Sequence, residues 1–204
     1  MSGYGWTTRS YADIIAPRRS IYDIADDLPF EEARLEQVCA LALEATPWAE
    51  GVRTGRLVIL LGRQHQLLWE LAAQGLSQIE DADERGAAEL QQEASANGYG
   101  TLLVCEDEDE VRRLQERHPS RSAQMKEWSQ QSLGILQAHI WGMLEELGAG
   151  VSLQHHPLPE GALTRVWGLP TTWRLVAQMP FGSFNSLPAV KQTIPGAQDI
   201  KVFR

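Results

Sequence analysis

The stretch 148–182 constrains the fold more than any other part of the chain. A glycine ends a long helical pattern there, a short apolar segment follows, and this segment ends in Gln154, His155, His156 and Pro157. Polar side chains at the end of a strand, followed by a residue that breaks the strand, are typical of ligand sites in α/β proteins. The pattern therefore predicts a ligand site where this short strand ends.

Length and charge exclude several classes of protein. The chain has 204 residues, enough for one ordinary domain with an adequate core, and a formal net charge of −9. Nucleic-acid binding relies on clustered Lys and Arg, so this balance argues against it, whereas a small anionic cofactor needs only a few local cations. No apolar run approaches the roughly 20 residues needed to cross a bilayer, so no membrane partner is expected.

The two cysteines and the N-terminus predict a cytoplasmic location. Cys39 and Cys105 each lie in an apolar segment, as buried free thiols in a reducing compartment do. The first 17 residues lack the continuous apolar core of a secretory signal. We expect residues 1–16 to form an N-terminal arm and residues 17–204 to form a single domain.

Hydrophobic periodicity and helix punctuation predict the elements between these ends. Helices are expected at 31–45, 64–78, 80–93, 111–117 and 123–147, and strands buried on both faces at 57–61 and 98–105. The acids at 106–110 are those of a helix start rather than a Ca²⁺ site. The alternating segment 200–204 is too short to be a strand unless it joins a larger sheet.

The longest predicted helix, 123–147, carries small residues on one face. Gly134, Ala138 and Gly142 recur at every fourth position, and Gly148 supplies the C-terminal cap. Glycine inside a helix costs about 1 kcal/mol relative to alanine, so close approach of another backbone is the natural compensation. That neighbour belongs either to the same chain or to a second subunit.

Common catalytic motifs are missing from the sequence. It contains no Gly-x-Gly-x-x-Gly, P-loop lysine, Cys-x-x-Cys, His-Glu-x-x-His or Gly-x-Ser-x-Gly pattern. His155 and His156 are adjacent, so on a strand they point to opposite faces and do not readily share a metal ion. We therefore expect no metal site and no catalytic protein nucleophile, with the chemistry left to a cofactor.

A family resemblance rests on motifs that occur in order over residues 17–204. They are Arg18-Arg-Ser-Ile-Tyr22, Leu60-Leu-Gly62, His65, Leu68-Trp69, Gly98-Tyr-Gly100, Trp128-Ser129, Gln131-Ser132, Leu153-Gln-His155, Gln178-Met-Pro-Phe-Gly182 and Lys201-Val-Phe203. With these motifs in this order, the chain resembles the nitroreductase family, and most of all its fatty-acid-repression-mutant or type-II subgroup. The resemblance implies an α+β fold, with a mixed, mainly antiparallel sheet flanked by helices. It also implies a homodimer built around the long central helix, with C-terminal segments joining the partner's sheet.

The same resemblance implies a function. Two FMN molecules would lie at the dimer interface, and the protein would be an FMN-dependent NAD(P)H oxidoreductase that reduces nitroaromatic, quinone or similar acceptors by two-step hydride transfer. Arg18 and Ser20 would meet the FMN phosphate or the pyrimidine edge with Arg19 nearby, Lys201 and Arg204 would approach the phosphate, and Gln154 and His155 would line the flavin ring. Without the resemblance, Arg18 and Arg19 read as a solvated surface pair, and Gln154 and His155 as an ordinary loop.

The loop 46–56 departs from the family pattern. Gly51, Val52 and Arg53 stand where the family carries Asn-Ser-Gln that holds the flavin, although Arg53 or Arg56 offers positive charge instead. Trp48 replaces a small residue in the same loop. Trp48, Trp128 and Gln131 are the expected walls of the substrate pocket. Alternatively, Trp128 is an ordinary core residue. The departure also leaves open a nitroreductase-fold protein that has lost FMN and serves as a ligand-binding or regulatory module.

Overall fold

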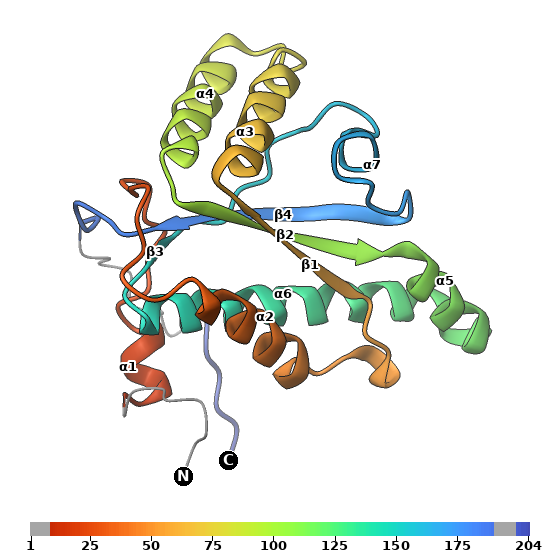
Figure 1. The fold of residues 1–204 in the computed structure, drawn as a ribbon. Coiled ribbons are helices and arrows are strands. Elements are labelled where there is room, and N and C mark those ends of the chain that lie inside the picture. The colour runs from red at the N-terminus through yellow and green to blue at the C-terminus, as the bar shows by residue number, and fades with distance from the viewer. Residues whose placement is uncertain (1–8, 190–198) are drawn as a thin grey trace.

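A four-stranded antiparallel sheet organises the chain, with helices on both of its faces (Figure 1). The structure is a computed structural model that describes residues 9–189 and 199–204. The strands, β1 (Gly55–Leu61), β2 (Gly100–Asp107), β3 (Gly150–Val151) and β4 (Trp173–Gly182), lie in the order β1-β2-β4-β3. All three pairings are antiparallel, so the α+β class is confirmed, but the described sheet is not mixed.

Helices cover the sheet in two layers. One face carries α2 (Ala33–Ala45) and α6 (Ser122–Glu146), and the other carries α3 (Gly62–Leu76), α4 (Ala82–Ala96) and α7 (Ala162–Trp167) (Figure 1). The remaining helices are α1 (Tyr11–Ile15), α5 (Glu108–Arg117) and the 3-10 turns Ala49–Gly51 and Pro119–Arg121. Each layer encloses its own apolar cluster against the sheet. No helix in the described ranges is long and apolar enough to cross a membrane.

The predicted helices are confirmed with small shifts in their ends. The 25-residue helix α6 buries Leu136, Ile140 and Leu144 along one stripe. Its end forms a Schellman cap, because the N–H of Gly148 donates to Glu145 at 2.9 Å and that of Ala149 to Leu144 at 2.9 Å. The cap requires the φ of +85° that Gly148 adopts.

The predicted burial holds for one strand and fails for another. All eight residues of β2 are buried, as expected for a strand with a partner on each side. Leu57, Val58 and Ile59 of β1 are only half-buried, so the prediction that this strand is buried on both faces is wrong. The reason is topological, because β1 is the edge strand of the described sheet and pairs with β2 alone.

The two ends of the chain are less regular than the middle. Residues 1–8 of the predicted arm lie outside the described residues, and the rest of it forms α1. The small-residue face of α6 meets α1 at Gly142, where an added Cβ would lie 3.5 Å from Ile14 Cγ2, so here the neighbour belongs to the same chain. Gly134 has no such neighbour among the described atoms. The segment 200–204 forms no strand within this single chain.

Candidate functional site

The segment that carries Arg18, Arg19 and Ser20 is fastened to the edge of the sheet. The N–H of Ile21 donates to the carbonyl of Val151 in β3 at 3.0 Å, and the N–H of Ala25 donates to Ser183 at 2.8 Å. Gly182 packs directly against the carbonyl oxygen of Ala25, in space that no side chain could share. The structure therefore brings the predicted N-terminal cations beside the short strand that leads to Gln154.

Arg18 lies on the face of an indole. Its Cζ is 4.2 Å from the ring centroid of Trp141, which belongs to α6. Arg18 Nη1 and Trp141 Nε1 are both buried donors without an acceptor among the described residues. Burial raises the pKa of the nearby Glu145 carboxyl, and the positive charges of Arg9 and Arg18 partly offset that rise. A buried, unpaired donor on a cation is a position where an anionic acceptor would be stabilised.

The other predicted cations differ in their surroundings. Arg19 is half-buried and donates to the carbonyl of Ala189, and Ser20 is half-buried beside it. Lys201 and Arg204 are exposed in the last described segment and make no hydrogen bond or ion pair there. Within this single chain the structure brings Arg18, Arg19 and Ser20 together but does not join Lys201 or Arg204 to them.

Gln154 and His155 line a cavity of about 340 Å³ beneath α3 and α4, together with Tyr22. Gln154 is buried, and its Nε2 donates to Ser152 Oγ at 3.0 Å. Its backbone pairs with Gln178 of β4 in both directions, at 2.8 and 2.9 Å. His155 is exposed, so the two side chains point to different environments, and Arg18 is not among the residues that line this cavity.

A buried polar cluster of His65, Trp69 and Thr101 packs against His156, the residue after His155. His65 Nε2 lies 3.2 Å from the carbonyl of Ala96, which can only accept, so Nε2 carries the proton of the neutral ring. Thr101 Oγ1 accepts from Trp69 Nε1 at 3.0 Å and lies 2.9 Å from His65 Nδ1, to which it can donate. The edge of His156 packs on Trp69 with ring centroids 5.6 Å apart. The hydrogen bonds of His65, Thr101 and Trp69 are all satisfied only while His65 is neutral, and His156 Nε2 is buried without a partner among the described residues.

We expect the protein to lose stability as the pH falls below 6.5. Burial lowers the pKa of both His65 and His156 from their ordinary value of 6.5, with the charge of His155 adding to the shift at His156. Above pH 6.5 both imidazoles are neutral in the folded and in the unfolded protein, so the free energy of unfolding is at its full value. Below it the unfolded chain takes up protons first, so the free energy of unfolding falls as the pH drops from 6.5 through the folded pKa values.

Urea unfolding of the wild type and of His65→Gln between pH 5.5 and 7.5 measures this loss. The variant lacks one of the two depressed imidazoles, so its stability should depend less on pH over this range. Identical slopes in the two proteins would contradict the assignment.

The loop 46–56 is folded down on the core. Trp48 Nε1 donates to the carbonyl of Leu43 at 3.0 Å, and its ring lies where a Cβ on Gly55 would come within 2.5 Å of Cη2. Glu50 adopts a left-handed conformation with φ of 48°, which is strained for a residue with a side chain. Trp48 therefore packs beside Gly55 at the start of β1, as a partly buried core residue.

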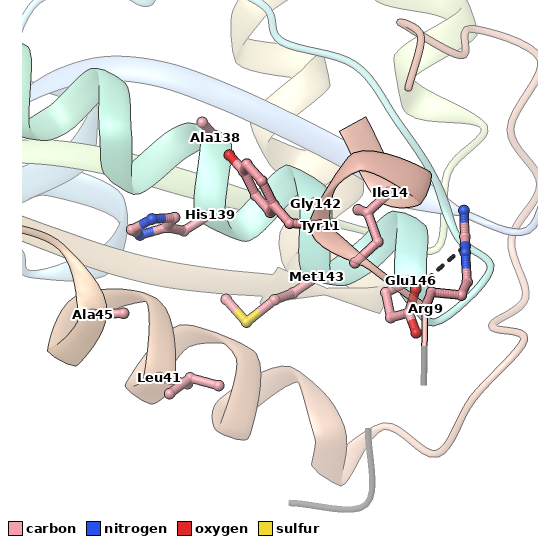
Figure 2. Close-up of a pocket in the computed structure, with 10 residues that line it drawn as sticks. All are labelled: Arg9, Tyr11, Ile14, Leu41, Ala45, Ala138, His139, Gly142, Met143 and Glu146. Carbon is pink, nitrogen blue, oxygen red and sulfur yellow. Dashed lines mark ion pairs between the residues drawn. The ribbon is translucent and has the colours of Figure 1, made fainter. Parts of the chain in front are cut away.

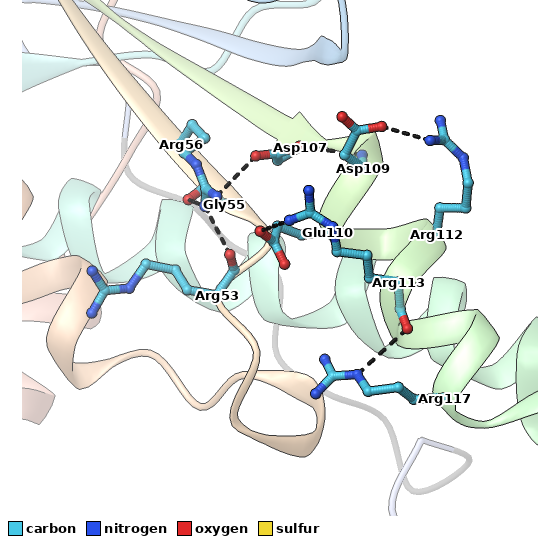
Figure 3. Close-up of polar contacts among 9 residues, drawn as sticks. All are labelled: Arg53, Gly55, Arg56, Asp107, Asp109, Glu110, Arg112, Arg113 and Arg117. Carbon is cyan, nitrogen blue, oxygen red and sulfur yellow. Dashed lines mark hydrogen bonds and ion pairs between the residues drawn. The ribbon is translucent and has the colours of Figure 1, made fainter.

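Of the two arginines in this loop, Arg56 forms an ion pair, whereas Arg53 forms none with the residues that the structure describes. Arg56 forms an ion pair with Asp107 at 2.8 Å and donates to the carbonyl of Arg53 at 2.7 Å (Figure 3). The guanidinium of Arg53 is exposed and points away from that ion pair (Figure 3). Arg53 thus keeps its charge available to an anion.

The predicted pocket walls on α6 lie near its start. Trp128 is half-buried, with Arg121 Cζ 5.7 Å from its ring centroid, and Gln131 is exposed. They flank Ser129, which belongs to a buried network that the sequence analysis missed. Ser129 Oγ donates to Glu106 Oε1 at 2.7 Å and lies 2.7 Å from Thr54 Oγ1.

The network is completed from β4. Arg174 Nη2 donates to Glu106 Oε2 at 2.6 Å, and the Glu106 side chain is only 2% exposed. The acidic run was predicted to serve the start of α5, and Asp107 does cap that helix by accepting from the N–H of Asp109 at 3.2 Å. Glu106 itself belongs to the strand and ties α6, β2 and β4 together.

A second cavity, of about 380 Å³, separates α1, α2 and α6 (Figure 2). Its walls are mainly apolar and include Ala138 and Gly142 from the small-residue face of α6. The ion pair of Arg9 with Glu146, at 3.3 Å, closes one end (Figure 2). None of the predicted cofactor or substrate residues lines it.

The sequence of this chain is similar to those of known proteins. The sequence matches the nitroreductase family over residues 15–183. It is 28% identical to nitroreductase FRM2 of Saccharomyces cerevisiae over 191 residues, which cover 92% of this chain and 94% of that protein.

Solved structures extend the likeness to the fold. The nitroreductase CinD of Lactococcus lactis in complex with chloramphenicol has a TM-score of 0.85 at 31% identity, over 96% of this chain and 100% of that one. The same protein was solved with 4-nitrophenol. A putative nitroreductase of Exiguobacterium sibiricum in complex with FMN has a TM-score of 0.71 at 11% identity, covering 97% of this chain and 99% of that one, which is a likeness of fold alone.

Proposed function

Since the chain belongs to the nitroreductase family and is a nitroreductase-like oxidoreductase, we propose that it is an FMN-dependent NAD(P)H oxidoreductase that reduces nitroaromatic, quinone or similar acceptors. One observation carries the cofactor part of the proposal: Arg18 holds a buried guanidinium nitrogen that has no acceptor among the described residues, beside Arg19 and Ser20. Similarity to a protein solved with 4-nitrophenol supports the acceptor class.

The residues present fit a phosphorylated cofactor. In a chain with a net charge of −9, two consecutive arginines and a serine at the sheet edge provide local donors for a phosphate of about two negative charges. Arg18, Arg19 and Ser20 would hold the phosphate or the pyrimidine edge, with Lys201 and Arg204 approaching it. Gln154 and His155 would lie along the ring, and the free charge of Arg53 would replace part of the missing Asn-Ser-Gln contacts.

Bound FMN would supply the hydride chemistry, first from NAD(P)H and then to the acceptor. The chain itself needs no acid or base for the hydride step, so its residues act by position and electrostatics. Trp128 and Gln131 would bound the space in which the nicotinamide and the acceptor alternate. Trp48, packed on Gly55, would shape that space from the loop side.

We also propose that the functional unit is a homodimer. Ile200, Val202 and Phe203 near the C-terminus expose most of their apolar surface in the single chain, with Phe203 91% exposed. Clustered apolar surface of this kind is typical of an interface. Gly134 and Ile135 on α6 are exposed as well, which leaves part of the central helix open to a partner.

The visible spectrum of the purified protein tests the cofactor directly. A flavoprotein shows absorption bands at about 370 and about 450 nm that come from the bound cofactor. A colourless protein that fails to take up added FMN would refute the proposal. That result would favour the alternative function, a nitroreductase-fold protein that has lost FMN and serves as a ligand-binding or regulatory module. The altered loop, in which Trp48 packs on Gly55, would then account for the loss of FMN.

Arg18→Ala is expected to lower the affinity for FMN by about 10- to 100-fold, because a hydrogen bond to a charged group contributes about 1.5–3 kcal/mol. Quenching of flavin fluorescence during titration of apoprotein measures the dissociation constant. Arg63→Ala is the matched control, since Arg63 is an exposed arginine that pairs with Glu70 on α3. Equal affinities for the two variants would show that Arg18 does not contact the cofactor.

A further inference from the structure

Trp141, whose indole ring lies under Arg18, belongs to none of the sequence motifs that point to the cofactor. Residues 18 and 141 come together only because the 18–25 segment docks along β3 while α6 passes beneath it. Trp141 is half-buried, and its ring packs beside the main apolar cluster on the α6 side of the sheet. The core therefore holds the indole in place beneath Arg18.

The contact changes what Arg18 can do. An arginine side chain has many rotamers, and this conformational entropy is lost when it binds a ligand unless its conformation is already restricted. A guanidinium over an indole face is held by a cation–π attraction that grows when water is excluded, and Nη1 is buried here. Nη1 has no acceptor among the described residues, so it can still bind an oxygen atom of a ligand.

A competing carboxylate lies on the same helix. Glu145 is one turn beyond Trp141 and is close enough to Arg18 for that cation to lower its pKa, against the larger rise from burial. Arg9 has the larger effect on the Glu145 pKa. An ion pair of Arg18 with this carboxylate would withdraw the Arg18 charge from an external anion.

From these contacts we infer that Trp141 is a positioning residue for phosphate recognition. Its indole face holds the Arg18 guanidinium away from Glu145, ready to bind the phosphate of a flavin mononucleotide. The inference rests on the proposed function and adds to it a residue that acts through Arg18. The inference predicts that removal of the indole face weakens binding of the phosphate and leaves binding of the flavin ring unchanged.

Comparison of FMN with riboflavin, which has the same ring and no phosphate, isolates this effect. Dissociation constants of both ligands are measured for the wild-type apoprotein, Trp141→Leu and Trp141→Phe, with circular dichroism to verify folding. Trp141→Leu should bind FMN about 5- to 30-fold more weakly and riboflavin with unchanged affinity. Trp141→Phe keeps an aromatic face and should stay within about 3-fold of the wild type for both ligands.

Trp173→Leu is the matched control, because Trp173 also lies under an arginine, with Arg56 Cζ 5.9 Å from its ring, but at the opposite end of β4 from Gly182. It should leave the ratio of the two affinities unchanged. In the Arg18→Ala background, Trp141→Leu should no longer change FMN binding, since the two residues act as one unit.

Three outcomes would overturn the inference. Equal weakening of FMN and riboflavin by Trp141→Leu would show that the tryptophan serves only the fold. Additive effects of Trp141→Leu and Arg18→Ala on FMN binding would separate the two residues. A wild-type protein that prefers FMN to riboflavin while Trp141→Leu keeps that preference would refute this inference alone, whereas a wild-type protein that binds neither ligand would refute the proposed function itself.

Discussion

Replacing Arg174 with methionine is expected to lower the free energy of unfolding by about 2–3 kcal/mol. Arg174 is the cation that partners the buried carboxylate of Glu106, at 2.6 Å. Its loss leaves that carboxylate with Ser129 as its remaining hydrogen-bond donor, inside a core where an unpaired charge is strongly unfavourable. The expected loss is smaller than for a fully buried ion pair because the Arg174 side chain is 42% exposed, so water reaches one partner.

Arg112→Met provides the control, since its ion pair with Asp109 has the same 2.6 Å separation but both side chains are exposed, at 61% and 38%. Guanidinium unfolding of the two variants compares burial at constant geometry, and Arg112→Met should change stability by about 0.5 kcal/mol or less. Equal losses in the two variants would show that the Glu106 network contributes nothing beyond a surface ion pair.

Gly182→Ala is expected to destabilise the protein by about 3 kcal/mol. Its new Cβ would overlap the carbonyl oxygen of Ala25, a backbone atom that cannot rotate aside. Relief requires the segment 18–25 to move off the sheet, which would break the hydrogen bonds of Ala25 and Ile21. Because that segment carries Arg18, the affinity for FMN should fall together with stability.

Gly86→Ala is the matched substitution, because Gly86 lies inside α4 and an added Cβ there meets nothing within 4 Å. This variant should gain about 0.5–1 kcal/mol from the better helix propensity of alanine. Thermal unfolding of both variants should therefore shift in opposite directions. A Gly182→Ala protein as stable as the wild type would show that the close approach to Ala25 is not needed.

Local patterns in the sequence predicted the elements and their caps well. The apolar stripe of α6 and the glycine after it were sufficient to predict a long helix capped by Gly148, because helix periodicity and left-handed caps depend on neighbours in the chain. The acids around the start of α5 were predicted for the same reason. In these cases the interactions span at most a few residues.

Features that depend on distant neighbours were not predicted. The apolar run in β1 looks like a central strand, but strand order places it at the edge. Glu106 follows an apolar strand and precedes other acids, and only the fold brings Arg174 to it. Arg18 was chosen by resemblance, yet the indole of Trp141 that lies under it is 123 positions away, and no local pattern points to that pairing. The roles of all the candidate cofactor and substrate residues stay predictions, namely those of Arg18, Arg19, Ser20, Arg53, Gln154, His155, Lys201, Arg204, Trp48, Trp128 and Gln131.

Both native thiols are buried, so a cysteine introduced at the surface can be labelled selectively. Burial raises the pKa of Cys39 and of Cys105 to about 12, with Glu36 adding to the rise at Cys39. At neutral pH neither forms an appreciable amount of the thiolate that maleimides attack. A single engineered cysteine at an exposed position such as Glu89 of α4 would then carry a fluorophore alone, so that energy transfer between labelled copies could report subunit pairing in the otherwise native protein.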